Sequence, residues 1–117
     1  MLALLIGAPA CEQPPQRQHF MAHASAERGR AIIARVGCAS CHSIPGIDWP
    51  QGRLGPPLDE FATRTLIAGR VPNRAGELSA FVQNAPAIVP GTGMPAMPLT
   101  AEESRDVAAY LYTLRAR

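Results

Sequence analysis

The run Cys38-Ala39-Ser40-Cys41-His42 constrains this 117-residue chain more than any other feature of its sequence. Two cysteines separated by two residues, with a histidine directly after them, form the attachment pattern of a c-type haem. Each thiol adds to one vinyl group of the porphyrin, and one tight turn can present both sulfurs to the same haem edge. The adjacent histidine then offers a ring nitrogen to the iron. We therefore expect one covalent haem c, bound through Cys38 and Cys41, with His42 as an axial ligand.

Two other kinds of site also use a closely spaced pair of cysteines. A zinc site needs a second pair of ligands, and the remaining candidates, Cys11, His19 and His23, all lie upstream of the motif. A thioredoxin-like redox site lies in an alternating pattern of strands and helices, and no such pattern surrounds this motif. Both remain as alternatives, but the immediate histidine favours haem attachment.

The composition agrees with a small single-domain protein built around a cofactor. Aromatic residues make up only 5% of the chain, so a core of aliphatic side chains alone is thin, and a buried haem would add much apolar volume. The 12 prolines and 10 glycines predict long ordered loops between helices. A formal net charge of +2 is too small to indicate a nucleic-acid partner.

The N-terminal part of the chain is expected to lie outside the folded domain. Residues 1–10 are apolar and end in small side chains directly before Cys11, as at the end of a secretory or lipoprotein signal. In a lipoprotein, Cys11 would carry the lipid; an ordinary export signal and a structured N-terminus are the alternatives. Residues 12–25 are polar and contain two prolines, which predicts a flexible linker. We therefore divide the chain into residues 1–11 as signal, 12–25 as linker and 26–117 as domain.

Hydrophobic periodicity predicts an all-α domain, with no strand pattern of any length. The first three predicted helices cover residues 26–37, 59–68 and 77–84, and a fourth begins after Thr100. This last helix is the best defined, because Thr100 and Glu103 have the spacing of a capping box. Its apolar residues recur at helical spacing and predict one buried stripe.

The run from Gly29 to Leu114 resembles class I cytochrome c. In that class the haem site lies early in the chain and a methionine loop precedes the last helix, and this sequence has the same order. The resemblance implies an all-α fold with three main helices, short helices and long loops around one covalent haem. It also identifies Gly29 as the glycine at which the first helix crosses the last, with Tyr110 packed over it. The lysine ring of the mitochondrial type is missing, since the chain contains no lysine.

The resemblance also implies roles for the residues around the haem. Gly55-Pro56 is similar to a Gly-Pro segment whose proline carbonyl accepts the second ring N–H of the haem histidine, here His42. That bond fixes the tautomer and strengthens the ligand. Arg64 falls where the family often has an arginine that reaches a haem propionate. Phe81 matches an aromatic residue that lines the methionine side of the haem.

Pro90-Gly91-Thr92-Gly93-Met94 resembles the segment that carries the distal methionine ligand, which selects Met94 over Met97. Two interpretations of Trp49, the single tryptophan, stay open. It packs on the haem edge or donates to a propionate, or it is a loop residue that shields the core.

Together, His42 and Met94 would fill both axial positions and leave none for substrate, and the soft thioether raises the reduction potential. The resemblance therefore implies a one-electron carrier rather than an enzyme, exported to the bacterial periplasm or its membrane face. Its redox partners would be a quinol-oxidising complex or dehydrogenase as donor and a terminal oxidase as acceptor in a respiratory chain. One alternative is a haem subunit held permanently in a larger oxidase or dehydrogenase complex. Another is a sensor-like or peroxidase-like protein in which the methionine dissociates.

Overall fold

The computed structural model describes residue 7 and residues 15–115. Most of the expected signal segment and Cys11 lie outside the described residues, so the structure carries no information on lipid attachment. Among the described helices, none has both the length and the apolar character needed to cross a bilayer.

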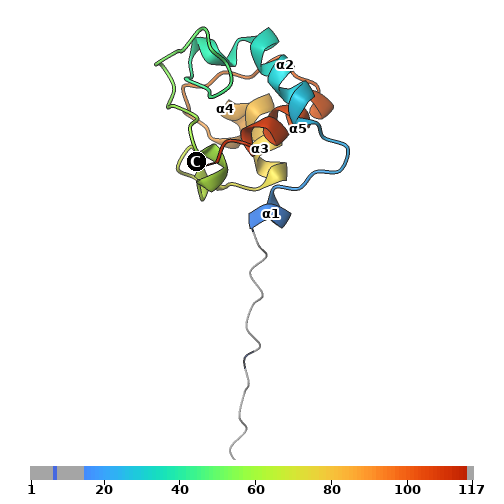
Figure 1. The fold of residues 1–117 in the computed structure, drawn as a ribbon. Coiled ribbons are helices and arrows are strands. Elements are labelled where there is room, and N and C mark those ends of the chain that lie inside the picture. Colours follow the sequence, from blue (N-terminus) through green and yellow to red (C-terminus); the bar gives the residue numbers. More distant parts are fainter. Residues whose placement is uncertain (1–6, 8–14, 116–117) are drawn as a thin grey trace, which may run out of the picture.

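The described chain is mainly helical, which confirms the prediction of an all-α domain. The helices are α1 (Pro15–Gln18), α2 (Ala26–Val36), α3 (Ala75–Gln83), α4 (Ala85–Ile88) and α5 (Ala101–Leu111), with 3-10 segments η1 (Cys38–Ser40) and η2 (Phe61–Thr63) and a hairpin of β1 (Leu66–Ile67) and β2 (Val71–Pro72). Helix α5 packs against both α2 and α3, and long loops enclose the remaining space (Figure 1).

The sequence signals at the ends of α2 and α5 match the structure. Ser25 caps α2 by accepting a hydrogen bond from the backbone N–H of Arg28, and Gly37 ends the helix in the left-handed conformation at a φ of 82°. Both hydrogen bonds of the capping box between Thr100 and Glu103 are present at the start of α5. These two well-capped helices cross each other, and one face of each contributes to the core.

The prediction of a helix over residues 59–68 was wrong. Only three residues form a 3-10 turn there, and β1 then pairs antiparallel with β2, so the expectation of no strand was also wrong for this short pair. Ala68 and Gly69 both adopt positive φ angles, at 51° and 68°, which turn the chain back on itself. Helix α4 was expected to be a loop; Pro86 is tolerated because it stands in the first turn, where its missing N–H has no partner to lose.

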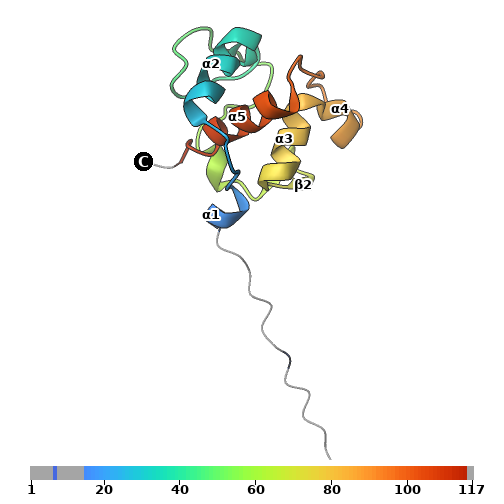
Figure 2. The same cartoon turned by 90° about the vertical axis from the view of Figure 1, so that its right-hand side faces the viewer.

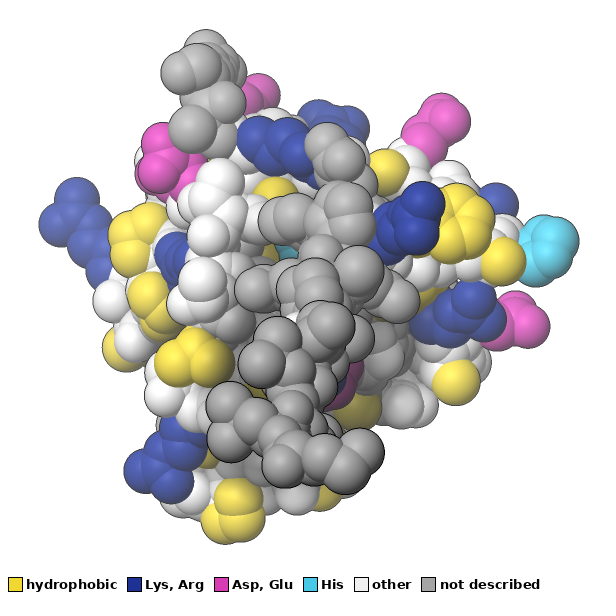
Figure 3. All heavy atoms as spheres, turned by 90° about the horizontal axis from the view of Figure 1, so that it is seen from below, with side chains coloured by type: hydrophobic (Ala, Val, Ile, Leu, Met, Phe, Trp, Pro, Cys, Tyr) yellow, Lys and Arg dark blue, Asp and Glu magenta, His cyan; other side chains and the backbone are white. Residues whose placement is uncertain are grey.

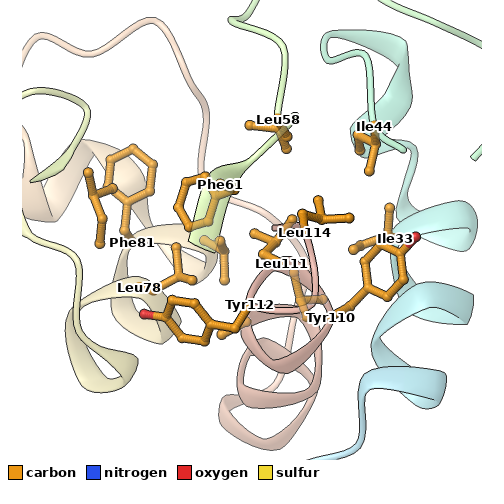
Figure 4. Close-up of a cluster of buried hydrophobic side chains, with 14 of the residues drawn as sticks. Ile33, Ile44, Leu58, Phe61, Leu78, Phe81, Tyr110, Leu111, Tyr112 and Leu114 are labelled. Carbon is orange, nitrogen blue, oxygen red and sulfur yellow. The ribbon is translucent and has the colours of Figure 1, made fainter. Parts of the chain in front are cut away.

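The buried core lies between α2, α3 and α5 and extends to the segment that carries η2 (Figure 4). Figure 4 labels ten of its side chains, namely Ile33, Ile44, Leu58, Phe61, Leu78, Phe81, Tyr110, Leu111, Tyr112 and Leu114. The aromatic rings come from different elements and are spread around the core. Four of the six aromatic residues, Phe61, Phe81, Tyr110 and Tyr112, are therefore buried where several elements meet.

We call residues 15–25 the N-terminal strap, and its part from His19 onward packs against the domain. The His19 ring stacks on Tyr112, with ring centroids 3.8 Å apart and planes 7° from parallel. Arg105 donates to the carbonyl of Ala22 at 2.7 Å. Part of the segment expected to be a flexible linker is thus docked, and its polar composition gave no sign of these long-range contacts.

The strap brings α1 to one end of the molecule, below α3 and α5 in Figures 1 and 2. Seen from that end, arginine, acidic and hydrophobic side chains are interspersed on the visible surface (Figure 3). This mixture contrasts with the largely apolar interior that the helices enclose.

Candidate haem site

A cavity of about 530 Å³ opens between the helices, and its walls are mostly apolar. It is bounded by η1, the loop over residues 54–58, η2, α3 and the loop over residues 92–97. All seven side chains expected at a haem from the sequence line this one cavity: Cys38, Cys41, His42, Pro56, Arg64, Phe81 and Met94. Residues separated by more than fifty positions in the chain thus meet at one site.

The turn of η1 presents both cysteines to the cavity. The backbone N–H groups of Cys41 and His42 both donate to the carbonyl of Cys38, at 3.2 and 3.1 Å, so the motif folds as one tight turn. Both thiols are free and half-buried. A thioredoxin-like site lies in an alternating pattern of strands and helices, whereas the described chain is mainly helical with one pair of two-residue strands. The structure therefore speaks against the thiol-redox alternative.

The zinc alternative also finds no ligand set in the part of the chain that the structure describes. There, no three side chains of histidine, cysteine, aspartate or glutamate come together as a possible metal site. His19, one of the upstream candidates, stacks on Tyr112 instead.

The imidazole of His42 is fixed by the segment that follows the haem-binding turn. Its Nδ1 lies 2.7 Å from the carbonyl oxygen of Pro56, and because that oxygen can only accept, Nδ1 carries the proton. Nε2 is thereby left as the nitrogen that can bind iron. Gly55 lies so close to the ring that an added Cβ would be 2.4 Å from Cε1. The missing side chain at this position is therefore a requirement of the histidine's orientation.

Two methionines line the cavity from the loop before α5. Met94 and Met97 are both partly buried against the core. The backbone N–H of Met97 donates to the carbonyl of Gln83 at 3.1 Å, which ties the loop to α3. Because both side chains reach the cavity, the selection of Met94 over Met97 stays a prediction from the sequence.

Arg64 and Phe81 stand on other parts of the wall. Phe81 is buried in α3. The Arg64 guanidinium donates to the carbonyl of Pro57 and lies 5.4 Å from the centre of the Phe61 ring. Its expected contact with a haem propionate stays a prediction.

Trp49 does not belong to the cavity wall as the structure describes it. It is 85% exposed, so the interpretation that it shields the core is wrong. Leu54, which the sequence did not single out, is 90% exposed and lies at the cavity's rim.

Asn73 supports the segment that carries Arg64, behind the cavity wall, and sequence reasoning missed it. It is buried, and its side-chain amide donates to the carbonyls of Phe61 and Arg64, at 3.2 and 3.0 Å. The hydroxyl of Tyr112 donates to its side-chain oxygen at 3.0 Å. A lone asparagine between a proline and an arginine has no sequence signature that separates this role from a turn, so only the folded chain reveals it.

The donors and shape of the cavity fit a c-type haem. Its apolar walls suit a porphyrin, and both thiols come from one turn on its wall. His42 keeps one ring nitrogen free, and thioether sulfurs approach from a different loop. Cys38 and Cys41 would hold the group covalently, and the iron would supply one-electron redox chemistry.

The Cytochrome c family model matches residues 26–115. The chain belongs to the cytochrome c family. This membership, with the fold described above, makes it a class I c-type cytochrome domain that carries one covalent haem c, attached through its cysteines, and transfers electrons.

Two known proteins similar to this cytochrome c illustrate the settings in which such domains occur. It is 31% identical over 91 residues to cytochrome c oxidase subunit 2 of Alkalihalophilus pseudofirmus, which covers 77% of this chain and 26% of that protein. The chain thus spans about a quarter of the length of this curated relative. The crystal structure of SoxXA from P. pantotrophus superposes with a TM-score of 0.59 at 25% identity, covering 91% of this chain and all of that one.

Proposed function

We propose that this cytochrome c is a one-electron carrier whose iron is bound by His42 and Met94. The observation that carries the proposal is the bond between His42 Nδ1 and the Pro56 carbonyl, which leaves Nε2 for the iron. A methionine on the same cavity supplies a soft second ligand. With both axial positions filled, little rearrangement accompanies oxidation or reduction, which suits transfer of electrons rather than catalysis on a bound substrate.

The other predicted side chains would complete the haem environment. Phe81 would pack on the methionine side, Pro56 would orient the histidine, and Arg64 would reach a propionate. The apolar lining would keep water away from a bound haem and so raise its reduction potential, in the same direction as the thioether.

The place of the carrier is proposed to be a bacterial respiratory chain. Electrons would arrive from a quinol-oxidising complex or dehydrogenase and leave towards a terminal oxidase. The similarity to an oxidase subunit supports the acceptor side of this proposal. The same similarity, and that to SoxXA, supports the second candidate, a haem subunit held permanently in a larger complex.

We further propose that the chain is exported to the periplasm and held at its membrane face through lipid on Cys11. The support is the apolar run over residues 1–10, which ends in small side chains before that cysteine. Intact mass spectrometry of protein from native membranes tests this. The expected mass is that of a chain cleaved before Cys11 and lipidated; an unmodified Cys11 in the soluble periplasmic extract would exclude the anchor.

Absorption spectra of the oxidised and reduced protein, expressed with haem-maturation machinery, test the carrier itself. The expected result is a low-spin covalent haem with the weak near-infrared band of ferric iron bound to sulfur. Failure of the ferrous protein to bind carbon monoxide at neutral pH is also expected. A stable carbon monoxide complex would instead indicate a sensor-like or peroxidase-like protein. Copurification in mild detergent separates a free carrier from a permanent subunit.

A further inference from the structure

The guanidinium of Arg64 makes contacts within the protein, besides the propionate contact proposed for it. It donates to the carbonyl of Pro57 and lies over the ring of Phe61. Pro57 directly follows Pro56, whose carbonyl accepts from the Nδ1–H of His42 at 2.7 Å. The arginine thus holds the peptide next to the one that orients the axial histidine. An interaction with a propionate, as expected from the sequence, does not account for this contact.

The backbone of the segment that contains Arg64 is held in place by hydrogen bonds from Asn73. The side-chain amide of Asn73 donates to the carbonyls of Phe61 and Arg64, and its backbone N–H donates to the carbonyl of Thr65 at 3.1 Å. Three carbonyls of one short segment therefore accept hydrogen bonds from a single buried residue. Such a residue fixes the backbone from which the arginine side chain extends.

The side chain of Asn73 is itself held by a hydrogen bond from Tyr112, the residue directly after α5. The Tyr112 hydroxyl donates to its side-chain oxygen at 3.0 Å, and both side chains are buried. Burial raises the pKa of Tyr112 well above its usual range, so the hydroxyl keeps its proton and remains a donor. A continuous set of contacts therefore runs from the end of α5 to the histidine.

We propose that Arg64 is a positioning residue for His42, acting through the Pro56–Pro57 segment and held in place by Asn73 and Tyr112. This inference rests on the proposed binding of iron by His42. We call Tyr112, Asn73, Arg64 and Pro57 the arginine brace. The brace limits the movement of the Pro56 carbonyl, and so keeps the hydrogen bond to His42 short.

The arginine brace and a contact between Arg64 and a propionate affect the reduction potential in opposite directions. A firm bond from Nδ1–H to a carbonyl makes the imidazole a stronger donor to iron, which favours the ferric state. Loosening the brace should therefore raise the reduction potential. Removing a positive charge beside a propionate would instead lower the potential, because the charge opposes the ferric state.

Asn73→Ala separates these two effects, since it loosens the brace and changes no charge. We expect its reduction potential to rise. In the diamagnetic ferrous protein, we expect the Nδ1 proton of His42 to exchange with solvent at least about tenfold faster in both Asn73→Ala and Arg64→Met. Arg53→Met removes an exposed arginine from the neighbouring loop and is the matched control; its exchange rate should equal that of the wild type.

Unchanged His42 proton exchange in Arg64→Met, or an unchanged or lower potential in Asn73→Ala, would overturn the proposal. If either variant fails to fold with haem, Tyr112→Phe provides the same test, because it deletes only the hydroxyl at the far end of the brace. Its exchange rate should rise by a smaller factor, and no rise would count against the brace. The near-infrared band of the wild type reports separately on the proposed ligands, so the two proposals can fail independently.

Discussion

A Cβ atom added to Gly29 would lie 1.9 Å from the backbone carbonyl oxygen of Asp106. The same atom would be 3.1 Å from the Cβ of Tyr110. Helices α2 and α5 therefore cross backbone against backbone, and the tyrosine packs beside the contact. The hydroxyl of Tyr110 donates a hydrogen bond to the carbonyl of Pro45, at 2.6 Å. This bond links the helix crossing to the loop that follows the haem-binding motif.

Gly29→Ala should destabilise the haem-loaded protein by about 3 kcal/mol, because the helices must separate to admit the methyl group. Denaturant unfolding followed by circular dichroism measures the change. Gly76→Ala is the matched control, since Gly76 lies in α3 and an added Cβ there meets nothing within 4 Å. That control should be neutral or more stable by up to about 1 kcal/mol. Equal losses in the two variants would contradict a backbone crossing.

Gly55→Ala should displace the ring of His42, because the new methyl group would overlap Cε1 and Nδ1, which an added Cβ would approach to 2.4 and 2.7 Å. The expected result is a large loss of correctly matured haem protein, with a high-spin fraction in the ferric absorption spectrum. Gly76→Ala, in α3 and outside the cavity wall, has open space around the added atom and should keep the low-spin spectrum. A low-spin Gly55→Ala protein with full haem content would refute the steric argument.

Met94→Ala should abolish the near-infrared band of ferric iron bound to sulfur and lower the reduction potential, since a harder ligand or water replaces the thioether. Met97→Ala should leave both properties nearly intact. Both side chains line the cavity, so the pair forms its own control. An exchange of the two results would mean that the loop binds iron three residues later than the sequence indicates.

The carboxylate of Asp106 should make folding stability depend on pH in the acid range. Burial opposes its ionisation, but hydrogen bonds from Arg28 and from the backbone N–H of Ser25 outweigh this and hold its pKa below the usual value. A lowered pKa in the folded state stabilises the protein above the ordinary aspartate pKa of about 3.9, and this contribution is lost as the pH falls further. Melting temperatures of wild type and Asp106→Asn should therefore differ at pH 7 and converge as the pH falls below the ordinary aspartate pKa and through the lowered pKa of the folded state.

Asp59→Asn provides the comparison for this pH series, because Asp59 is an exposed aspartate outside the helix crossing. Its melting curve should follow that of the wild type. A constant difference between wild type and Asp106→Asn over the whole series would show that the lost contacts, and not the charge, determine the stability.

The sequence predicted those parts of the molecule that short-range chemistry determines. The haem-binding turn could be predicted because its cysteines and histidine stand within five consecutive residues. The start of α5 could be predicted because Thr100 and Glu103 have the spacing of a capping box. The hairpin after η2 was missed because each of its strands is only two residues long, too short for a periodic pattern to show. Asn73 was missed because its partners come from two distant segments.

The choice between Met94 and Met97 illustrates the opposite limit. Helical and loop patterns place both near the cavity, and the structure brings both to it. The sequence separates them only by the resemblance of the Pro90–Met94 segment to a family motif. The packing of the chain does not tell the two methionines apart, so the spectra and reduction potentials of the two variants have to identify the iron ligand.

The docked N-terminal strap changes how far this domain can travel from an attachment point. A flexible chain over residues 12–25 would reach roughly 20 Å in root-mean-square terms. Because the strap is docked on the domain from His19, residues 12–18 link the docked part to Cys11. A flexible chain of these seven residues would reach only roughly 15 Å by the same measure. A carrier anchored at Cys11 would then sit at the membrane surface with its α1 end towards the bilayer, and would meet partners by lateral diffusion more than by reaching for them.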